Sequence, residues 1–232
     1  MMISVCMATY NGSDFISDQI DSILSQISFS DELVIVDDCS TDETVKKIQA
    51  FNDPRIRIIV NAVNQGPIIS FANALGKAKG DFLFLADQDD VWHKDKVSKV
   101  MAAFINQDAI LVVHDGIVTD RDLTQIDSSW NHYNHSKPSH SLVQTLIKNS
   151  YTGAMMAMKR ELLKLVLPFP TEITMHDWWI ALVALKHHQK VVVLPDKLVD
   201  YRRHMGTVTG SRRPLQKMFL DRMKMLRLVS EA

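Results

Sequence analysis

Short apolar runs alternate with stretches of helical periodicity over the first part of the chain. In the first helical stretch, apolar side chains recur every three or four residues and so share one helix face. They are Ile16, Ile20, Ile23, Leu24 and Ile27. The pattern predicts strands at 3–8, 33–36, 55–60 and 81–86, and further helices at 41–51 and 68–78. Such alternation is typical of an α/β fold with a mostly parallel sheet, helices on both faces and ligands at the carboxyl ends of the strands.

The second half of the chain is less regular. It predicts strands at 109–113, 152–158 and 191–194, helices at 160–166 and 177–186, and a polar loop or excursion at 120–141. No internal repeat or low-complexity linker divides the sequence, so nothing in it indicates a second independent domain. In the first half, Ser40 and Glu43 have the spacing of a capping box, which would start the helix at 41–51.

The composition narrows the classes of function. A formal net charge of -1 gives no basis for binding nucleic acid. The two cysteines, Cys6 and Cys39, are too few for a disulfide framework, and they indicate reduced thiols in the cytoplasm. The N-terminal apolar run has no basic segment before it and breaks at Thr9. We therefore expect a first strand there, and neither a signal peptide nor a membrane span.

Three carboxylates, Asp87, Asp89 and Asp90, follow the predicted strand 81–86 directly. A packed core does not hold unpaired charges at this density. Carboxylate oxygens suit Mg²⁺ or Mn²⁺, and an ion held by one or two carboxylates completes its coordination with water and phosphate oxygens. The cluster therefore indicates a divalent cation with a nucleoside diphosphate. A solvated acidic turn is the alternative.

Two other polar clusters also follow predicted strands: residues 9–11 after the first, and Asp37 with Asp38 after the second. Because the carboxyl ends of parallel strands meet at one edge of a sheet, we expect all three clusters to converge on one rim. The alternative for Asp37 or Asp38 is a structural one, in which the carboxylate caps the helix that follows.

Seven short blocks of the sequence occur in an order that carries a family resemblance. They lie at 8–12, 36–42, 64–66, 87–92, 152–153, 176–179 and 201–204. Together they resemble glycosyltransferase family 2, over residues 3–210. The Asp-Gln-Asp-Asp-Val-Trp and Met-His-Asp-Trp-Trp forms are most similar to the bacterial rhamnosyltransferase-like branch, which builds O-antigen, capsule or cell-wall polysaccharides.

The resemblance implies a GT-A fold, which is a nucleotide-binding αβα sandwich around a mostly parallel sheet with a C-terminal acceptor-side extension. It implies one domain at 1–210, with a nucleotide-sugar-binding half at 1–92 and an acceptor and catalytic half at 93–210, followed by a helix at 211–232. The implied reaction inverts the anomeric configuration. It moves a sugar from a UDP- or dTDP-sugar, such as dTDP-rhamnose, to a glycan or lipid-linked acceptor.

The resemblance also implies which residues bind the nucleotide. Tyr10 would lie on the nucleobase face with Thr9 and Asn11 nearby, and Asn64 belongs to the same site. Asp38 would accept a hydrogen bond from the pyrimidine N3–H, which uracil and thymine share. The resemblance therefore implies UDP or dTDP without choosing between them.

Further residues are implied to surround the diphosphate. Asp87 would bind the ribose or a metal-bound water. Asp89 would bind Mg²⁺ or Mn²⁺, and His204 would reach the same metal or the diphosphate. The guanidinium of Arg202 or Arg203 would assist at the diphosphate.

The general base of an inverting transfer is implied to be Asp177. The alternative is that Asp177 is an ordinary acidic residue in the first helical turn, with His176 as the helix cap or a surface residue. Since Trp178 and Trp179 are neighbours on a helix, we expect one to face the core and the other to form a platform for an acceptor sugar.

Two other classes of function remain open. An apolar strand followed by Asp87-x-Asp89-x-Val91 also matches the nucleophile motif of haloacid dehalogenase-type phosphohydrolases, in which Asp87 would form an aspartyl phosphate. That motif normally closes the first strand of its domain, whereas three strand-helix units precede it here. The third class is a non-catalytic sugar-binding module on the same fold.

The C-terminal segment is predicted to be a basic amphipathic helix that begins near Pro214. Its apolar side has Leu215, Met218, Phe219, Met225, Leu226 and Val229, and its basic residues are Arg212, Arg213, Lys217, Arg222, Lys224 and Arg227. Such a segment can lie in an anionic membrane interface and bring the enzyme to a lipid-linked acceptor at the inner face of the cell membrane. The alternative is that the helix packs on its own domain.

Overall fold

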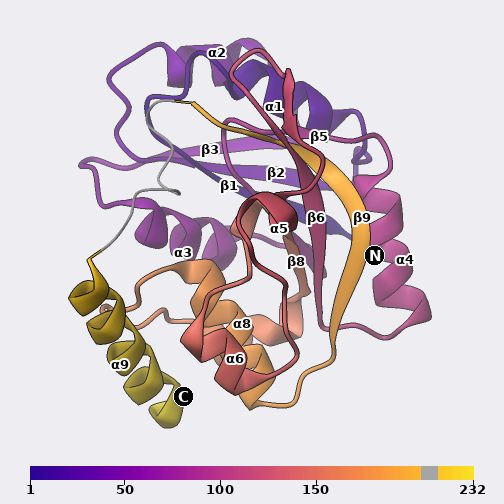
Figure 1. Ribbon diagram of the computed structural model, residues 1–232. Helices are drawn as coiled ribbons and strands as arrows, with labels where there is room; N and C mark the ends of the chain where they lie inside the picture. The colour runs from indigo at the N-terminus through magenta and orange to yellow at the C-terminus, as the bar shows by residue number, and fades with distance from the viewer. Residues whose placement is uncertain (205–213) are drawn as a thin grey trace.

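A computed structural model describes residues 1–204 and 214–232, in which the strands form one curled sheet with helices on both faces (Figure 1). The strands are β1 (Ile3–Thr9), β2 (Glu32–Asp37), β3 (Ile56–Val60), β4 (Phe82–Ala86), β5 (Val91–Trp92), β6 (Leu111–Thr119), β7 (Gln125–Asp127), β8 (Met156–Lys159) and β9 (Val191–Arg202). Their order in the sheet is β3-β2-β1-β4-β8-β6-β9-β5, and β7 pairs with β6. The predicted α/β class is confirmed.

Most strands of the sheet run in one direction. β1 to β4 pair in parallel, and β6 pairs in parallel with β9. β8 runs antiparallel between β4 and β6, so that β6 and β9 keep the direction of the first four strands. The register pairs Thr9 with Asp37 and Met7 with Ala86. The loops that follow β1, β2 and β4 therefore leave the sheet at the same edge.

The helices cover the sheet on both faces. The α-helices are α1 (Ile16–Leu24), α2 (Thr44–Ala50), α3 (Pro67–Lys77), α4 (Lys96–Asn106), α5 (Trp130–Tyr133), α6 (Leu142–Ile147), α7 (Leu163–Val166), α8 (His176–Lys186) and α9 (Leu215–Glu231). Two 3₁₀ turns are η1 (Gly153–Met155) and η2 (Arg160–Leu162). Helices α1, α2 and α4 contribute to one buried cluster, and α3, α8 and α9 to a second.

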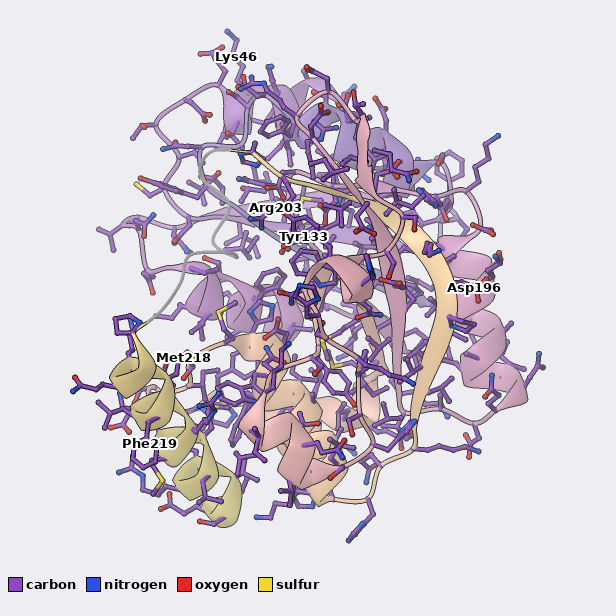
Figure 2. All side chains as sticks on the ribbon, in the orientation of Figure 1. Lys46, Tyr133, Asp196, Arg203, Met218 and Phe219 are labelled. Carbon is purple, nitrogen blue, oxygen red and sulfur yellow. The ribbon has the colours of Figure 1, made fainter. Side chains whose placement is uncertain are left out.

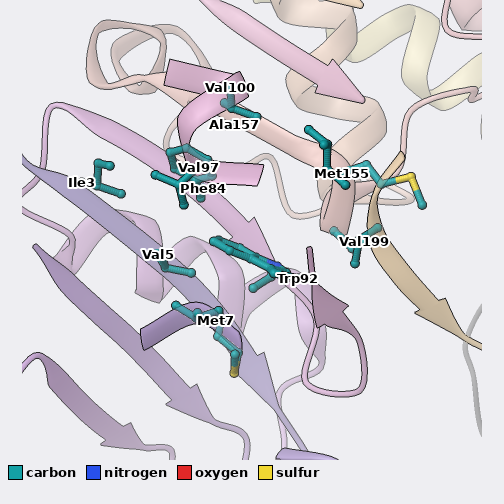
Figure 3. Close-up of a cluster of buried hydrophobic side chains, with 14 of the residues drawn as sticks. Ile3, Val5, Met7, Phe84, Trp92, Val97, Val100, Met155, Ala157 and Val199 are labelled. Atoms are coloured by element: carbon teal, nitrogen blue, oxygen red, sulfur yellow. The ribbon is translucent and has the colours of Figure 1, made fainter. Parts of the chain in front are cut away.

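Successive residues of β1 enter opposite clusters, because side chains alternate across a strand. Val5 and Met7 belong to the first cluster with Phe84 and Trp92 (Figure 3). Cys6 belongs to the second cluster and is fully buried. Since both faces of the sheet are covered, β1, β2 and β4 read as almost continuous apolar runs in the sequence.

Several predicted elements were wrong. The strand expected at 152–158 begins only at Met156, because Gly153–Met155 form η1. Helix α2 begins at Thr44 because the Ser40 hydroxyl donates to Asp37 Oδ2 (2.6 Å) and accepts from the Asn11 N–H (2.9 Å), so no capping box forms. The strand expected at 191–194 continues to Arg202, paired with β6. The stretch at 120–141, expected to be a loop or excursion, contains the short elements β7 and α5. Helices α4 and α6 were not predicted.

Helix α9 packs on the rest of the chain, beside α6 and α8 (Figure 1). Met225, Leu228 and Val229 are buried in the second cluster. Lys186 Nζ donates to the carbonyl oxygens of Val229 (2.6 Å) and Ala232 (2.6 Å) at the end of the helix. Of the helices in the described ranges, none combines the length and apolar character that crossing a membrane requires.

Candidate active site

A cavity of about 430 Å³ lies at the edge where β1, β2 and β4 end. The start of α3, the start of α8 and the end of β9 complete its wall. Among the residues that line it are Thr9, Tyr10, Asp38, Asn64, Asp87, Asp89, Asp177, Arg202 and His204. The three polar clusters therefore converge on one rim, as the sequence predicts.

The loop after β1 is held to the acidic loop after β4. The Tyr10 N–H donates to Gln88 Oε1 (2.9 Å), and Gln88 Nε2 donates to the Tyr10 carbonyl (3.1 Å). A Cβ at position 12 would lie 2.2 Å from Gln88 Oε1, so a side chain there would displace the Gln88 amide from Tyr10. The Tyr10 side chain keeps 46% of its surface exposed, which leaves its ring accessible at the cavity.

Asn11 does not line the cavity. Its Oδ1 accepts from the Thr41 N–H (2.8 Å), and its own N–H donates to the Ser40 hydroxyl (2.9 Å). These bonds join the loops after β1 and β2. Asn11 therefore supports the cavity from outside its wall.

The two neighbouring carboxylates after β2 have different surroundings. Asp37 is fully buried and accepts from Thr9 Oγ1 (2.9 Å) and from the Ser40 N–H (2.8 Å), so it shapes the turn. Asp38 lines the cavity and holds the loop before α3. Its Oδ1 accepts from Asn61 Nδ2 (2.8 Å) and the Gln65 N–H (2.9 Å), and its Oδ2 accepts from the Gly66 N–H (2.7 Å).

Neither carboxylate caps the next helix. Asp42 Oδ1 accepts from the Thr44 N–H (3.0 Å) at the start of α2 instead. A carboxylate has about four lone-pair sites. Because Asp38 accepts three hydrogen bonds from the described residues, it can accept one more at the cavity.

The carboxylates after β4 are buried to different depths. Asp90 is buried, and its Oδ1 accepts from the Arg202 N–H (3.1 Å). Asp87 and Asp89 line the cavity. Burial, together with the nearby charges of Asp89 and Asp177, raises the pKa of Asp87 to about 7. Such clustered carboxylates repel one another unless a cation is bound nearby.

A lysine that sequence reasoning missed lies behind this cluster. Lys96 is buried, its Nζ donates to the Ala154 carbonyl (2.7 Å), and the same atom lies 4.1 Å from the centre of the Trp92 ring. Burial lowers the pKa of Lys96 to about 7, although Asp90 and Asp87 oppose the shift. Nothing in the sequence around Lys96 indicated that it lies at the site, and the helix that contains it was not predicted.

Asp89 and His204 fit a divalent cation. Asp89 Oδ2 and His204 Nε2 lie 2.8 Å apart at the cavity. A carboxylate oxygen and an imidazole nitrogen both suit Mn²⁺, and the carboxylate suits Mg²⁺. Within residues 1–204 and 214–232, no group of three or more His, Cys, Asp or Glu side chains is placed to bind a metal. Water and substrate phosphates would therefore have to complete the coordination.

The two arginines of the 201–204 block differ. Arg202 lines the cavity and is buried, and its Nη2 pairs with Asp18 Oδ2 (3.0 Å). Its guanidinium carbon lies 4.8 Å from the centre of the Phe15 ring, which also contacts the His204 ring at 4.5 Å. Arg203 is not among the lining residues, and its N–H donates to the Thr119 carbonyl (2.8 Å).

Asp177 reaches the cavity from the first turn of α8. Its Oδ1 accepts from Asn149 Nδ2 (3.1 Å) and from the Trp178 N–H (2.5 Å), and its Oδ2 accepts from the Gly153 N–H (3.2 Å). Burial raises the pKa of Asp177 to about 6, although these hydrogen bonds oppose the shift. A fixed carboxylate with this pKa is suited to accept a proton near neutral pH.

The expectation for the two tryptophans was wrong, because both are buried. Trp178 Nε1 donates to the Thr145 carbonyl (2.7 Å), and Trp179 Nε1 donates to the Val166 carbonyl (2.9 Å). Helix α8 is buried on every side from its first residue to Ala184, so neither ring is available to a sugar. His176 is neither the cap, which is Met175, nor a surface residue.

The chain matches the family model described as Glycosyl transferase family 2 over residues 4–167. It is 26% identical over 213 residues to TuaG of Bacillus subtilis (strain 168), named as a teichuronic acid biosynthesis glycosyltransferase, with 91% of this chain and 82% of that protein covered. It is 35% identical over 96 residues to the Escherichia coli UDP-Glc:alpha-D-GlcNAc-diphosphoundecaprenol beta-1,3-glucosyltransferase WfgD, with 41% of this chain and 38% of that protein covered.

Solved structures share the fold. S. aureus TarS 1–349 in complex with UDP-GlcNAc superposes with a TM-score of 0.77 at 21% identity over 99% of this chain, which spans 65% of the TarS chain. The mannosyltransferase PcManGT from Pyrobaculum calidifontis, in complex with GDP-Man and Mn²⁺, gives a TM-score of 0.66 at 18% identity, with 98% of this chain and 69% of that chain covered. With a family model matched over more than half of its length, this chain belongs to glycosyltransferase family 2 and is a glycosyltransferase.

Proposed function

We propose that this glycosyltransferase moves a sugar from a UDP- or dTDP-sugar, with inversion, to a glycan or lipid-linked acceptor in bacterial surface polysaccharide synthesis. The observation that carries the proposal is that Asp38, Asp89 and Asp177 line one cavity. A pyrimidine acceptor, a cation ligand and a general base are thus available to one substrate. The names of TuaG and WfgD, and the UDP-GlcNAc bound to TarS, support this class of donor and product.

In this proposal, residues 1–92 bind the nucleotide. Asp38 accepts the pyrimidine N3–H with its remaining acceptor site, and Tyr10 contacts the base with its exposed ring. Thr9 and Asn64 line the same part of the wall, and Asn11 supports it from outside. The motif forms of the rhamnosyltransferase-like branch favour dTDP-rhamnose as the donor within this class.

Asp89 and His204 would hold Mg²⁺ or Mn²⁺ at the diphosphate, with Asp87 beside them at the ribose or at a metal-bound water. When bound, the cation neutralises charge on the diphosphate, which makes the nucleotide a better leaving group. Arg202 presents its guanidinium to the same region, held by Asp18 and Phe15.

The half at 93–210 carries the acceptor side, although its last residues, 205–210, lie outside the described range. Asp177 Oδ2 removes the proton from the acceptor hydroxyl as that oxygen attacks the anomeric carbon. The bond from the anomeric carbon to the diphosphate oxygen breaks, and the nucleoside diphosphate leaves. Family membership leaves the phosphohydrolase and the non-catalytic interpretations without support.

Calorimetric titration tests the proposed donor class. We expect UDP or dTDP to bind more tightly with Mn²⁺ than without it, and GDP to bind weakly in both cases, because the larger purine would place its N–H donors at a different position from the pyrimidine N3–H expected at Asp38. Equal affinity for GDP, UDP and dTDP would contradict the pyrimidine assignment.

The transfer rate should depend on pH through Asp177. Since the pKa of Asp177 is raised to about 6, its carboxylate is protonated as the pH falls through that value, and a protonated base cannot accept the acceptor proton. We expect the rate at saturating Mn²⁺ to be level above pH 7 and to fall about tenfold per pH unit well below pH 6. A rate that is constant from pH 5 to pH 8 would contradict this role.

We also propose that α9 contacts an anionic lipid surface with the face that it does not bury. That face carries Phe219, Leu220, Met223 and Leu226, which are 46% to 61% exposed. Figure 2 shows Phe219 on this helix at the edge of the molecule. Phe219 and Leu226 belong to the apolar side that the sequence suggests, whereas Met225 and Val229 of that side pack inward.

Some basic residues of α9 are exposed, and others contact the rest of the domain. Lys217 and Lys224 are exposed. Arg222 Nε donates to the Ile147 carbonyl (2.6 Å), and Arg227 pairs with Glu172. Arg212 and Arg213 lie outside the described residues. Exposed apolar side chains flanked by lysines complement a surface of acidic headgroups.

Liposome sedimentation at low salt tests this contact. We expect Phe219→Ser with Leu226→Ser to abolish sedimentation with anionic vesicles while the melting temperature stays unchanged. A matched control is Phe29→Ser with Ile105→Ser, which replaces two exposed apolar side chains elsewhere. If the first pair sediments like the unaltered protein, or if that protein never sediments with anionic vesicles, α9 does not bind lipid.

A further inference from the structure

The His176 imidazole is buried and has no hydrogen-bond partner in the described part of the chain. Its side chain is 4% exposed, and neither Nδ1 nor Nε2 is paired. Buried polar atoms in folded proteins are nearly always hydrogen-bonded, because leaving one unpaired costs its desolvation free energy. Two unpaired nitrogens on one ring therefore point to partners from outside the chain.

The ring is fixed at the cavity wall. His176 lines the cavity and stacks on Phe71 with 4.1 Å between ring centroids and 25° between planes. On another side it touches Gly153, where a Cβ would lie 2.8 Å from His176 Nε2. A side chain at position 153 would displace the ring, so this contact explains the glycine. Held by Phe71 and Gly153, the imidazole stands beside Asp177, the proposed base.

The charge state of the ring limits what it can bind. Burial lowers the pKa of His176 to about 4, so the imidazole is neutral near pH 7. A neutral imidazole donates from one nitrogen and accepts at the other. Hydroxyl groups can accept from the protonated ring nitrogen and donate to the other one. Phosphate oxygens only accept hydrogen bonds, and they attract cations. Sugar hydroxyls are therefore better matched to this ring than the diphosphate.

The ring also contacts the nucleotide-binding half of the chain. Phe71 belongs to α3, the helix that starts just after the loop held by Asp38. A group between Phe71 and Asp177 thus lies between the donor side and the base. With the nucleotide at Asp38 and the base at Asp177, as proposed, the transferred sugar lies in this part of the cavity.

We propose that His176 hydrogen-bonds hydroxyl groups of the donor sugar and so helps to determine which sugar is transferred. This inference rests on the proposed function as a nucleotide-sugar enzyme. His176 is then a specificity-determining residue that binds the sugar, whereas Asp38 and Tyr10 bind the nucleotide.

The test compares the affinity for sugar nucleotides with the affinity for nucleoside diphosphates, without acceptor and with Mn²⁺. The ligands are UDP, dTDP, UDP-glucose, UDP-GlcNAc and dTDP-rhamnose. His176→Phe keeps the ring but removes both nitrogens. We expect it to weaken the preferred sugar nucleotide about tenfold and to change the affinity for the matching nucleoside diphosphate less than twofold. His176→Gln, whose amide both donates and accepts, should recover part of the loss.

The matched control is His114→Phe, because His114 is also buried with an unpaired Nε2 but does not line the cavity. It should not change the ratio of the two affinities. Equal losses for sugar nucleotide and nucleoside diphosphate in His176→Phe, or no loss, would overturn the inference. If the unaltered protein binds neither UDP nor dTDP, the proposed function fails instead.

A measurement on the unaltered protein covers the case in which a variant does not fold. In imidazole ¹H–¹⁵N correlation spectra, the His176 nitrogens should shift when the sugar nucleotide is added and stay unchanged with the nucleoside diphosphate. A shift that appears only after acceptor is added would show that His176 binds the acceptor, and it would overturn the donor assignment.

Discussion

Replacing Asp177 with Asn is expected to lower sugar transfer by about two to four orders of magnitude, which is the usual contribution of a positioned general base. The carboxylate is held by the Asn149 amide and the Gly153 N–H at the cavity wall, so it has one fixed direction in which to accept a proton. An amide has nearly the same shape but cannot accept that proton. Donor affinity should stay near that of the unaltered protein, since the base faces the acceptor.

Initial rates and calorimetric titration of the donor, measured together, decide the role of Asp177. Asp196→Asn is a matched control, because that carboxylate pairs with Lys99 and does not line the cavity. Near-normal transfer by Asp177→Asn would remove the residue from the role of base. A large loss of donor affinity would instead make it part of the donor site.

Replacing Asp89 with Ala is expected to abolish the gain in donor affinity that Mn²⁺ provides. Asp89 is the carboxylate whose Oδ2 meets His204 Nε2 at 2.8 Å, and the loss of a direct ligand should cost more than the ten- to hundredfold typical of residues that only orient a ligand. The fold should persist, because Asp89 lies on a loop at the cavity rim.

Calorimetry with and without Mn²⁺, together with thermal melting, measures both parts of this expectation. Asp196→Ala provides the control at a carboxylate outside the cavity. If Asp89→Ala binds UDP or dTDP with the same dependence on Mn²⁺ as the unaltered protein, Asp89 is not a metal ligand. If it melts far below the control, its loss of affinity cannot be assigned to the metal.

Strands β1, β2 and β4 were predictable because each lies in the interior of the sheet and is covered on both faces, which produces continuous apolar runs such as Leu33 to Val36. The edge strand β3 was predictable from its own short apolar run, although its side chains are only partly buried. Strand β9 was predicted only in part, because Pro195, Asp196 and Lys197 interrupt its apolar pattern. The register with β6 shifts between Val113 and Asp115, opposite this interruption, so pairing resumes after Pro195. The sequence does not reveal such a bulge.

Some residues of the site were also predictable from the sequence, and others were not. Residues at the ends of parallel strands, such as Asp38 and Asp89, could be placed together because topology alone brings strand ends to one edge. Lys96 and His176 could not be placed, since their burial depends on how distant segments pack. The expectation that Trp178 or Trp179 is exposed was wrong for the same reason. Helical periodicity does not indicate that α8 is covered on every side.

The central claim is that the cavity binds a pyrimidine sugar nucleotide and transfers its sugar. The most direct measurement is nucleotide release from UDP-glucose, UDP-GlcNAc and dTDP-rhamnose, with and without Mn²⁺, in the presence of lipid-linked or glycan acceptors. We predict that at least one donor releases its nucleoside diphosphate in an acceptor- and Mn²⁺-dependent manner, and that Asp177→Asn loses this release. Release of inorganic phosphate from sugar phosphates, with no turnover of any sugar nucleotide, would contradict the account.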